Sequence, residues 1–454
     1  MSESDDQRLR ERRAFLARAA SVAALSGAAV GGAPRPASAI EARSDAHAFW
    51  GAHQAGIATP LQEHVYFATF DLTTTEREDV AQLLRAWTAA AARLTAGETA
   101  QPLQAGLQAV ADTGHAESPT ATYGRGQKFD VGIPAADSGE ALDLKPARLS
   151  ITFGFGVDLF SLKDGKDRFG LAAQRPEALV DLPRFPGDQL IAERTGGDLS
   201  IQACADDPQV AFHAVRQLAR IAAAVTQIRW VQSGFASLPA PNQAPRNLMG
   251  FKDGTNNVSV ADPHALAQYV WVGNEGPDWM RGGSYLVARR IRIALEHWDR
   301  MKLAFQEQTV GRQKYSNAAL GEKSALKPLD LAATDKDGNP VIPENSHVRL
   351  AAAASNDGAQ ILRRPYSYND GGNFTAERWP PWRQGMEYDA GLFFLAYQRD
   401  PRNGFIRIYE KMSRFDMLNQ FVTHVGGGLF ACPAGAMEGR YIGQSLFEAA
   451  ARAT

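Results

Sequence analysis

Two stretches in the second half of the chain combine residue types that could do chemistry together. The first, Gly250-Phe251-Lys252-Asp253-Gly254, holds a carboxylate between glycines, which suits close approach of the backbone to a flat ligand. An Asp-Gly pair between apolar runs is by itself typical of a turn. The second stretch has His347 in the run Asn345-Ser346-His347-Val348-Arg349-Leu350, expected to be extended, and, sixteen residues later, the pair Arg363-Arg364. A carboxylate, an imidazole and a guanidinium in this order indicate one functional site.

The order Gly-x-x-Asp-Gly, then a lone histidine, then an arginine resembles the dye-decolourising peroxidase family of haem enzymes. Further segments resemble the same family, so the resemblance covers essentially the whole chain after residue 39. They are Gly283-Ser284-Tyr285-Leu286-Val287, Asp389-Ala390-Gly391-Leu392-Phe393-Phe394 and Gly428-Leu429-Phe430-Ala431-Cys432-Pro433. The chain is most similar to the exported deferrochelatase/peroxidase branch of that family, which accompanies periplasmic iron uptake.

The resemblance implies haem b as cofactor, hydrogen peroxide and a small aromatic donor as substrates, and components of an iron-uptake system as partners. A homodimer is expected by analogy. A carrier that delivers haem, or releases its iron without peroxidase activity, is the alternative function, and a haem-free ferredoxin-like protein is a third. An aspartate and an arginine at the site favour the enzyme, because a carrier has no need of an acid/base group and a cation beside the bound haem.

The resemblance assigns a role to each residue of the site. His347 is expected to bind the haem iron through one nitrogen, while its other nitrogen contacts a group that the sequence does not identify. Asp253 is the expected proton acceptor and donor, and Arg363 supplies positive charge near the breaking O–O bond. Haem contacts are further expected from Gly254, Thr255, Asn256 and Arg363.

Two alternatives and one departure accompany these assignments. His424, in Phe421-Val422-Thr423-His424-Val425, is the alternative iron ligand, and Arg364 is the alternative to Arg363. Related sequences often carry Asn-Pro-Arg five to seven residues after the histidine, where this chain has Ala352-Ala353-Ala354. The contacts to the haem propionates are therefore in question. Leu392 and Phe394 are candidates for an apolar wall above the haem.

Apolar periodicity predicts the same order of elements in the two halves. In the first half, strands are expected at residues 64–70, 149–155 and 199–203 and from residue 228. A capping box at Thr75-Glu76-Arg77-Glu78 and the pair Asp207-Pro208 open its two helices. In the second half, strands are expected at 285–293, 347–353, 392–397 and 428–432, with helices at about 295–307 and 404–422.

This order predicts an α+β protein with two ferredoxin-like (β-α-β-β-α-β) halves, each an antiparallel sheet with helices. The N-terminal domain would span residues 40–236 and the C-terminal, haem-binding domain residues 246–454. A linker rich in Pro, Ala and Asn separates them.

Residues 1–39 resemble a signal peptide of the twin-arginine type. Arg12-Arg13 precede an alanine-rich apolar run, and Ala37-Ser38-Ala39 form a small-x-small cleavage site. The expected location is therefore the periplasm. No later apolar run reaches the roughly 20 residues that a span needs, so no stable membrane insertion is expected.

Charge and cysteine content narrow the function classes further. The 48 Lys and Arg residues nearly balance the 50 Asp and Glu residues without long blocks of one sign, so nucleic acid is not an expected partner. Two cysteines, Cys204 and Cys432, are too few for a disulfide scaffold or a thiolate metal cluster. A single bridge between them is left open by the sequence.

Overall fold

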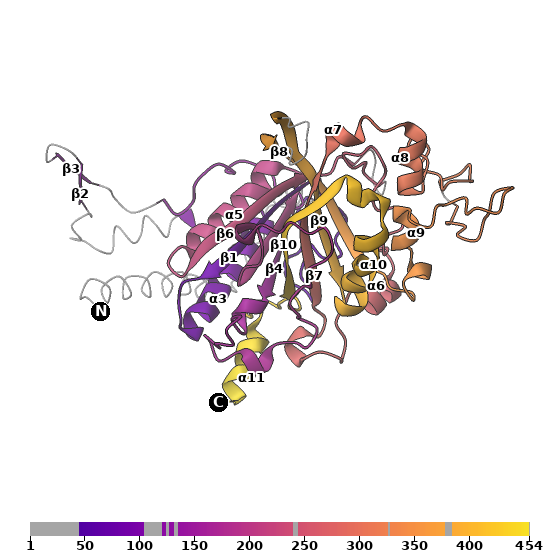
Figure 1. Ribbon diagram of the computed structural model, residues 1–454. Helices are drawn as coiled ribbons and strands as arrows, with labels where there is room; N and C mark the ends of the chain where they lie inside the picture. The colour runs from indigo at the N-terminus through magenta and orange to yellow at the C-terminus, as the bar shows by residue number, and fades with distance from the viewer. Residues whose placement is uncertain are drawn as a thin grey trace, which may run out of the picture.

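The computed structural model describes residues 45–103, 120–123, 127–130, 135–238, 244–325, 327–376 and 384–453 (Figure 1). The predicted signal peptide, residues 1–39, lies outside these ranges. Within them, no helix has both the length and the apolar character that crossing a membrane requires.

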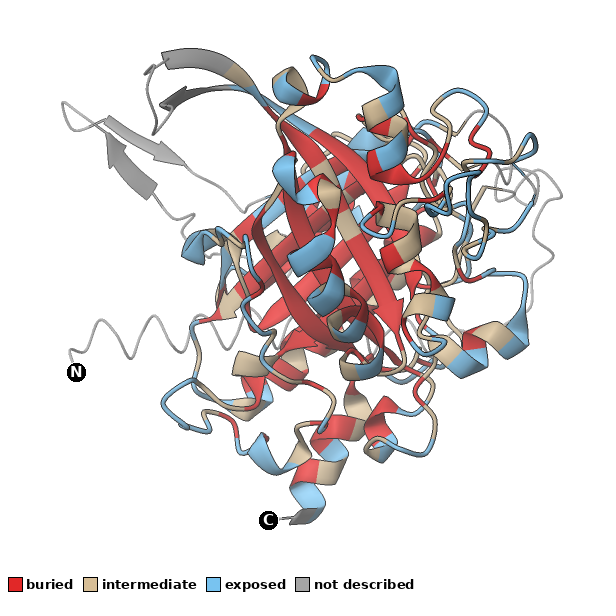
Figure 2. Ribbon diagram, turned by 45° about the vertical axis from the view of Figure 1, so that its right-hand side comes forward, coloured by how far each residue is buried: buried red, intermediate tan, exposed pale blue. Residues whose placement is uncertain are grey.

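A closed antiparallel barrel forms the centre of the molecule, with strand order β1-β5-β4-β10-β7-β9-β8-β6. Its strands are β1 (His64–Leu72), β4 (Ser150–Gly156), β5 (Leu199–Ala205), β6 (Thr226–Phe235), β7 (Ser284–Ile293), β8 (Leu362–Ala376), β9 (Gln384–Gln398) and β10 (Val422–Cys432). A separate two-stranded sheet contains β2 (Thr120–Tyr123) and β3 (Gln127–Asp130). Most strand residues of the barrel are buried (Figure 2).

Each half of the barrel repeats one strand order, and this confirms the two ferredoxin-like halves. The first half runs β6-β1-β5-β4 and the second runs β10-β7-β9-β8, so in each half the fourth strand lies beside the first and the third beside the second. The halves share their edges: β4 pairs with β10, and β6 pairs with β8. These pairings join the two half-sheets into a closed ring of strands.

Helices cover the outside of the barrel, with α3 and α5 on one side and α8, α9 and α10 on another (Figure 1). The α-helices are α3 (Arg77–Thr95), α5 (Pro208–Ala222), α6 (Pro263–Tyr269), α7 (Leu295–Trp298), α8 (Leu303–Val310), α9 (His347–Ala351), α10 (Arg407–Phe415) and α11 (Gln444–Ala453). The 3-10 helices are η1 (Val157–Leu159), η2 (Ala172–Gln174), η3 (Ala192–Arg194), η4 (Asp278–Met280), η5 (Ala353–Ser355) and η7 (Met417–Gln420), and η6 (Arg402–Ile406) is a π-helix.

The helix starts of the first half confirm one capping prediction and correct the other. The Asp207 side chain accepts hydrogen bonds from the backbone N–H groups of Gln209 and Val210, as expected for an N-cap followed by proline. The predicted capping box at Thr75 is wrong. Glu76 occupies the N-cap of α3 without a side-chain bond, and Thr74 instead donates to Asp79 and accepts from the N–H of Glu76.

The second half corrects the prediction for the segment that carries His347. Alternating apolar residues predicted a strand at 347–353, but His347–Ala351 form the short helix α9. The alternation is too short to distinguish the two structures, and the alanine-rich sequence favours a helix. The second strand of this half is β8, so Arg363 lies on a strand. The helix expected at 404–422 is divided between η6, α10 and η7, because Asp416 leaves the helical conformation and caps η7.

The C-terminal helix α11 packs against the first half of the molecule. Leu446 is fully buried in the core cluster that contains Trp87 of α3 and Phe153 of β4. The backbone N–H of Ile442 donates to the hydroxyl of Thr88 at 3.0 Å. The two halves therefore share a core as well as strand edges. Cys204 and Cys432 are both buried and free, so they do not form a disulfide.

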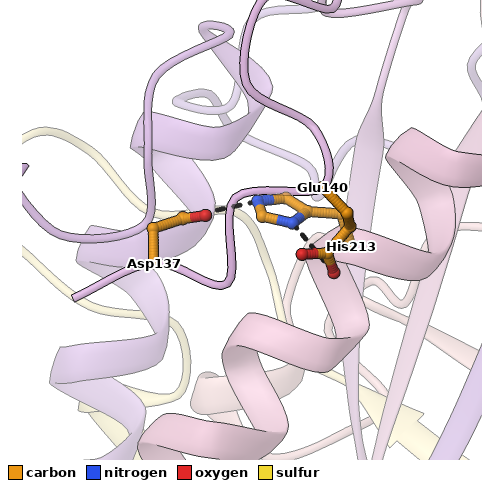
Figure 3. A group of neighbouring side chains, drawn as sticks. All are labelled: Asp137, Glu140 and His213. Atoms are coloured by element: carbon orange, nitrogen blue, oxygen red, sulfur yellow. Dashed lines mark ion pairs between the residues drawn. The ribbon is translucent and has the colours of Figure 1, made fainter. Parts of the chain in front are cut away.

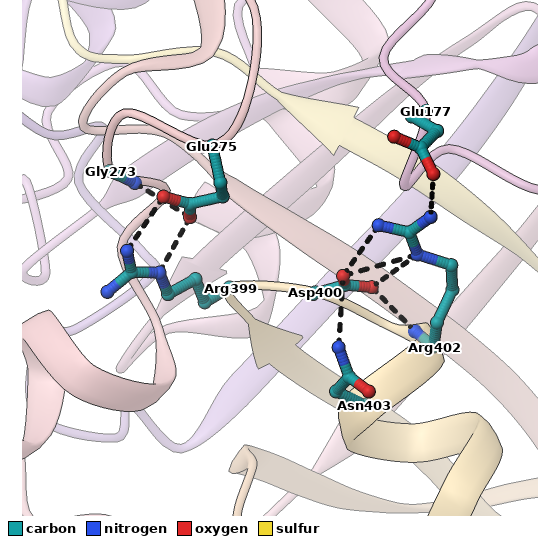
Figure 4. A network of polar contacts seen from close by, with 7 residues as sticks. All are labelled: Glu177, Gly273, Glu275, Arg399, Asp400, Arg402 and Asn403. Carbon is teal, nitrogen blue, oxygen red and sulfur yellow. Dashed lines mark hydrogen bonds and ion pairs between the residues drawn. The ribbon is translucent and has the colours of Figure 1, made fainter.

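A network of polar contacts follows the end of β9 (Figure 4). Arg399 binds Glu275 through two nitrogens, at 2.6 and 2.7 Å, and holds the pKa of this carboxyl at about 2. Arg402 contacts Asp400 at 2.9 Å and Glu177, from the first half, at 2.6 Å. These ion pairs lie where the chain leaves the barrel. They contribute little to the free energy of folding because they are partly exposed and water screens them.

Because the halves share a core and strand edges, we expect the molecule to unfold in one transition. Leu446→Ala should lower the free energy of unfolding by about 2–5 kcal/mol, since it removes a fully buried side chain. Differential scanning calorimetry should show one lowered peak. Glu448→Ala, on the exposed side of the same helix, is the control and should change little. Separate peaks for the two halves would contradict the shared core.

Candidate active site

A large open cavity lies beside the second half of the barrel and measures about 1730 Å³, including the solvent at its mouth. Every site residue predicted from the sequence lines it, namely Asp253, Gly254, Thr255, Asn256, His347 and Arg363. Its apolar walls come from β7, β9 and α10, and include Ile291, Leu392, Phe394, Ile408 and Met412. Residues far apart in the chain thus meet around one space.

The loop that carries Asp253 is held in shape by its own polar groups. The Asn247 side chain accepts hydrogen bonds from the N–H groups of Met249 and Phe251, both buried, and the N–H of Asp253 donates to the carbonyl of Pro245. Gly254 has a φ of +92°, which favours glycine, and the space beside its Cα is open. The loop therefore brings backbone and a carboxylate to the cavity without a side chain at position 254.

Arg363, near the start of β8, contacts Asp253 at the edge of the cavity. Its Nη1 donates to Asp253 Oδ1 at 2.9 Å, and both side chains are partly buried. The Asn257 side chain accepts from the backbone N–H of Arg363 and donates to its carbonyl, each at 2.8 Å. Asn257 thus fixes the backbone of Arg363, and Asp253 fixes its guanidinium.

Arg364, which the sequence left as the alternative to Arg363, does not line the cavity. It is buried, and its nitrogens donate to the Thr59 carbonyl and to Gln62 Oε1. Successive side chains on a strand point to opposite faces, so only one arginine of the pair can reach the cavity. The structure places Arg363 there.

His347 begins α9 and contacts a buried carboxylate. Its Nδ1 lies 2.6 Å from Asp416 Oδ2, and Asp416 Oδ1 accepts from the backbone N–H of Leu418. With Nδ1 engaged, Nε2 is the nitrogen left to bind a metal ion. Burial acts to lower the pKa of His347, but the charge and hydrogen bond of Asp416 outweigh it and raise the pKa. Asp416 thus fixes the ring and makes it a stronger electron donor.

His424, the alternative ligand, also lines the cavity but lacks such a partner. Its ring stacks on Tyr409 with 4.5 Å between centroids, and its buried Nδ1 has no hydrogen-bond partner among the described residues. Burial, with a smaller effect from Arg289, lowers the pKa of His424 well below its ordinary value. Burial thus favours the neutral form of this ring, and no carboxylate of the described residues orients it.

Two site residues, Asp416 and Asn257, were not predicted from the sequence. Asp416 lies 69 residues after His347, and its only local signal is that it caps the short helix η7. Asn257 directly follows the predicted motif, but its partner is 106 residues away. Both act through contacts between distant segments, which spacing along the chain does not reveal.

A second group of potential metal ligands lies away from the cavity, at helix α5 (Figure 3). Asp137 Oδ2 is 3.4 Å from Nε2 of His213, and Glu140 Oε1 is 3.2 Å from Nδ1 of the same ring. The carboxylates thus face opposite nitrogens of one imidazole. A single ion can bind only one of these nitrogens, so the geometry suits a histidine that holds residues 137–140 to α5.

The cavity fits a haem. Its walls are largely apolar, as a flat macrocycle requires, and one open nitrogen of a histidine whose other nitrogen is bound by a carboxylate is a suitable axial ligand for iron. A carboxylate and a guanidinium occupy the same space. The arrangement can bind a metal-containing ring and transfer a proton beside it.

Comparison with known proteins gives matches along nearly the whole chain. The model described as Dyp-type peroxidase, N-terminal, matches residues 54–236, and the C-terminal model of the same family matches residues 244–437. A dye-decolorizing peroxidase of Thermobifida fusca (strain YX) is 38% identical over 99% of this chain and 100% of its own. A deferrochelatase of Escherichia coli (strain K12) is 32% identical over 89% of this chain and 88% of its own.

Solved structures agree with these matches. A crystal structure of a DyP-type peroxidase from Streptomyces coelicolor is 38% identical, covers 91% of this chain and 100% of its own, and superposes with a TM-score of 0.75. Ferric DtpA from Streptomyces lividans has the same identity and coverage and a TM-score of 0.74.

The His347–Asp416 contact leads to a prediction about cofactor binding. His347→Ala should abolish stable haem binding, and Asp416→Asn should weaken it by about 10- to 100-fold, because the ring loses its charged partner. Both effects are measured by titrating the apoprotein with haemin and following the Soret band. His424→Ala is the control and should bind haem normally. If His424→Ala loses the band while His347→Ala keeps it, the ligand assignment is reversed.

Proposed function

We propose that this chain, which belongs to the Dyp-type peroxidase family, uses haem b to reduce hydrogen peroxide while it oxidises a dye-like or phenolic donor. The observation that carries this function is the Asp253–Arg363 ion pair in the cavity that His347 also lines. The site thus combines a metal ligand, a proton acceptor and a fixed positive charge.

In this proposal His347 Nε2 binds the iron, and the apolar side chains of β7, β9 and α10 enclose the ring. Asp416 holds His347 in the orientation that presents Nε2 to the cavity. Bound haem supplies an iron centre that exchanges electrons between peroxide and donor. Gly254, Thr255 and Asn256 line the same space and contact the haem in this proposal.

Asp253 and Arg363 perform the proton and charge steps. Asp253 Oδ1 is engaged by Arg363, and Oδ2 has no hydrogen-bond partner among the described residues, so Oδ2 takes a proton from one oxygen of the peroxide and gives it to the other. Arg363 stabilises the negative charge that develops as the O–O bond breaks. Two electrons and two protons, released by the donor as it is oxidised, complete the reduction of one peroxide to two waters.

The deferrochelatase relatives suggest a second function, release of iron from haem. A haem carrier or deferrochelatase without peroxidase activity would need His347 and the apolar walls but not Asp253 and Arg363. Because these two residues are brought together at the cavity, the peroxidase function is favoured over the carrier alone.

Location and partners follow from the sequence resemblance. We infer export to the periplasm by the twin-arginine route, supported by Arg12-Arg13, the apolar run and Ala37-Ser38-Ala39. That route carries folded proteins, which agrees with a cofactor bound before export. Iron-uptake components as partners and a homodimeric state are inferred by analogy with the exported branch, and sedimentation of the mature protein would test the dimer.

The role of Arg363 is tested by Arg363→Leu. The variant should bind haem with a normal Soret band but react with hydrogen peroxide about a hundredfold more slowly, because one fixed donor of this kind contributes about 3 kcal/mol. Stopped-flow absorbance after mixing with peroxide measures the rate. Arg407→Leu, which removes an exposed arginine of the same half, is the control. An unchanged rate in Arg363→Leu would remove this residue from the mechanism.

The export proposal is tested by replacing the arginine pair. In a host with a twin-arginine translocase, the double substitution Arg12→Lys and Arg13→Lys should leave unprocessed protein in the cytoplasm, because that route depends on the paired arginines. Cell fractionation measures the distribution. The exported wild-type protein should begin near Ile40. Normal periplasmic accumulation of the doubly substituted protein would contradict this route.

A further inference from the structure

Arg312 lines the cavity from the turn that directly follows helix α8. Gly311 ends that helix with a φ of +90°, and a Cβ at Gly311 would lie 2.5 Å from Val348 Cγ2. The backbone of this turn therefore lies against the short helix that carries His347. The Arg312 side chain lines the cavity from there.

The guanidinium of Arg312 is buried without an acidic partner among the described residues. The residue is 6% exposed, and the one hydrogen bond that its guanidinium makes to the described part of the chain runs from Nη1 to the Asn317 carbonyl, at 2.9 Å. Burial lowers the pKa of Arg312, and no carboxylate in the described ranges offsets this effect. Other buried arginines show the usual arrangement: Arg289 pairs with Asp188 at 3.0 Å and Arg290 with Asp389 at 2.9 Å.

A buried charge without a counter-charge is costly, so such groups are normally paired or bind a ligand. Arg364 is also buried without an acidic partner, but two of its nitrogens are bonded to Thr59 and Gln62, away from the cavity. At the cavity, the two acidic residues already have partners: Asp253 binds Arg363 and Asp416 binds His347. Lys252 also lines the cavity but is only partly buried, so Arg312 is the buried cavity-lining cation with which an anionic group of a ligand would pair.

We propose that Arg312 binds a propionate carboxylate of the haem. The inference rests on the proposed function, because haem is the ligand that brings carboxylates into this cavity. The three alanines that follow α9, Ala352 to Ala354, have no side-chain donor for this purpose. Arg312 lines the cavity from the turn after α8, and its planar guanidinium matches a carboxylate.

Haem dimethyl ester tests this contact separately from the rest of the haem, because both of its propionates are esterified and carry no charge. Wild-type apoprotein should bind haem more tightly than the diester. Arg312→Leu should lower the affinity for haem by about 10- to 100-fold and leave the affinity for the diester unchanged, because only a charge-assisted contact is removed. Arg312→Lys should retain part of the preference for haem. Equal losses for both ligands, or no loss for either, would overturn the proposal.

The thermal stability of the same variants gives a second readout. Arg312→Leu should raise the Tm of the apoprotein, since it removes an uncompensated buried charge, and should lower the Tm of the haem-bound protein relative to wild type. Arg349→Leu is the matched control. Arg349 lies on α9 and donates to the carbonyls of Ile342 and Leu331 at 2.9 Å, so its loss should lower both Tm values. A decrease in both for Arg312→Leu would show a merely structural role and overturn the inference.

Two different results distinguish an error in the Arg312 proposal from an error in the proposed function. If the wild-type apoprotein gives no Soret band with haem, the function itself is wrong. If it binds haem normally and Arg312→Leu only raises the KM for a sulfonated dye, Arg312 binds the donor, and the propionate proposal alone is wrong.

Discussion

Closure of the barrel is the constraint on which the rest of the structure depends. Each half supplies four strands in the same order, and each leaves two edges that would otherwise carry unpaired N–H and C=O groups. Pairing of β4 with β10, at two residue pairs, and of β6 with β8, at one, joins these edges and closes the ring of strands. Once the sheet is closed, β7, β8 and β9 have fixed positions, and the cavity residues on them are fixed as well. The barrel therefore holds the side chains that these strands contribute to the cavity, Arg363 among them.

The cavity combines apolar walls with a few charges that are held by other charges. Asp416 holds His347, and Asp253 and Arg363 hold each other. Each pair joins segments distant in the chain, so the groups are positioned before any ligand binds. Such preorganisation lets a charge act on a reacting bond without reorganisation at the moment of reaction. Arg312 is the exception, and the absence of an acidic partner among the described residues points to a ligand carboxylate.

The two activities named among the relatives place different demands on this cavity. Retaining a haem requires a ligand for iron, apolar walls and partners for the propionates. Breaking the O–O bond of peroxide additionally requires a proton acceptor and a cation at the open face of the ring. The chain has groups suited to both sets: α9, η7, the turn after α8 and residues 254–256 for retention, and Asp253 with Arg363 of β8 for reaction. The two sets can therefore be varied separately.

The sequence by itself determined the α+β class and the repeated order of strands and helices, because these depend on local periodicity. It also indicated Asp253, His347 and Arg363, since each lies in a short recognisable run. Tertiary structure decided the rest. The alternation after His347 fits a strand or a helix over so few residues, and the alanine-rich sequence together with packing against α8 and α10 favours the helix. The choice of Arg363 over Arg364 follows from which face of β8 looks onto the cavity. Asp416, Asn257 and Arg312 acquire their roles only through contacts with segments far along the chain, which no local pattern encodes.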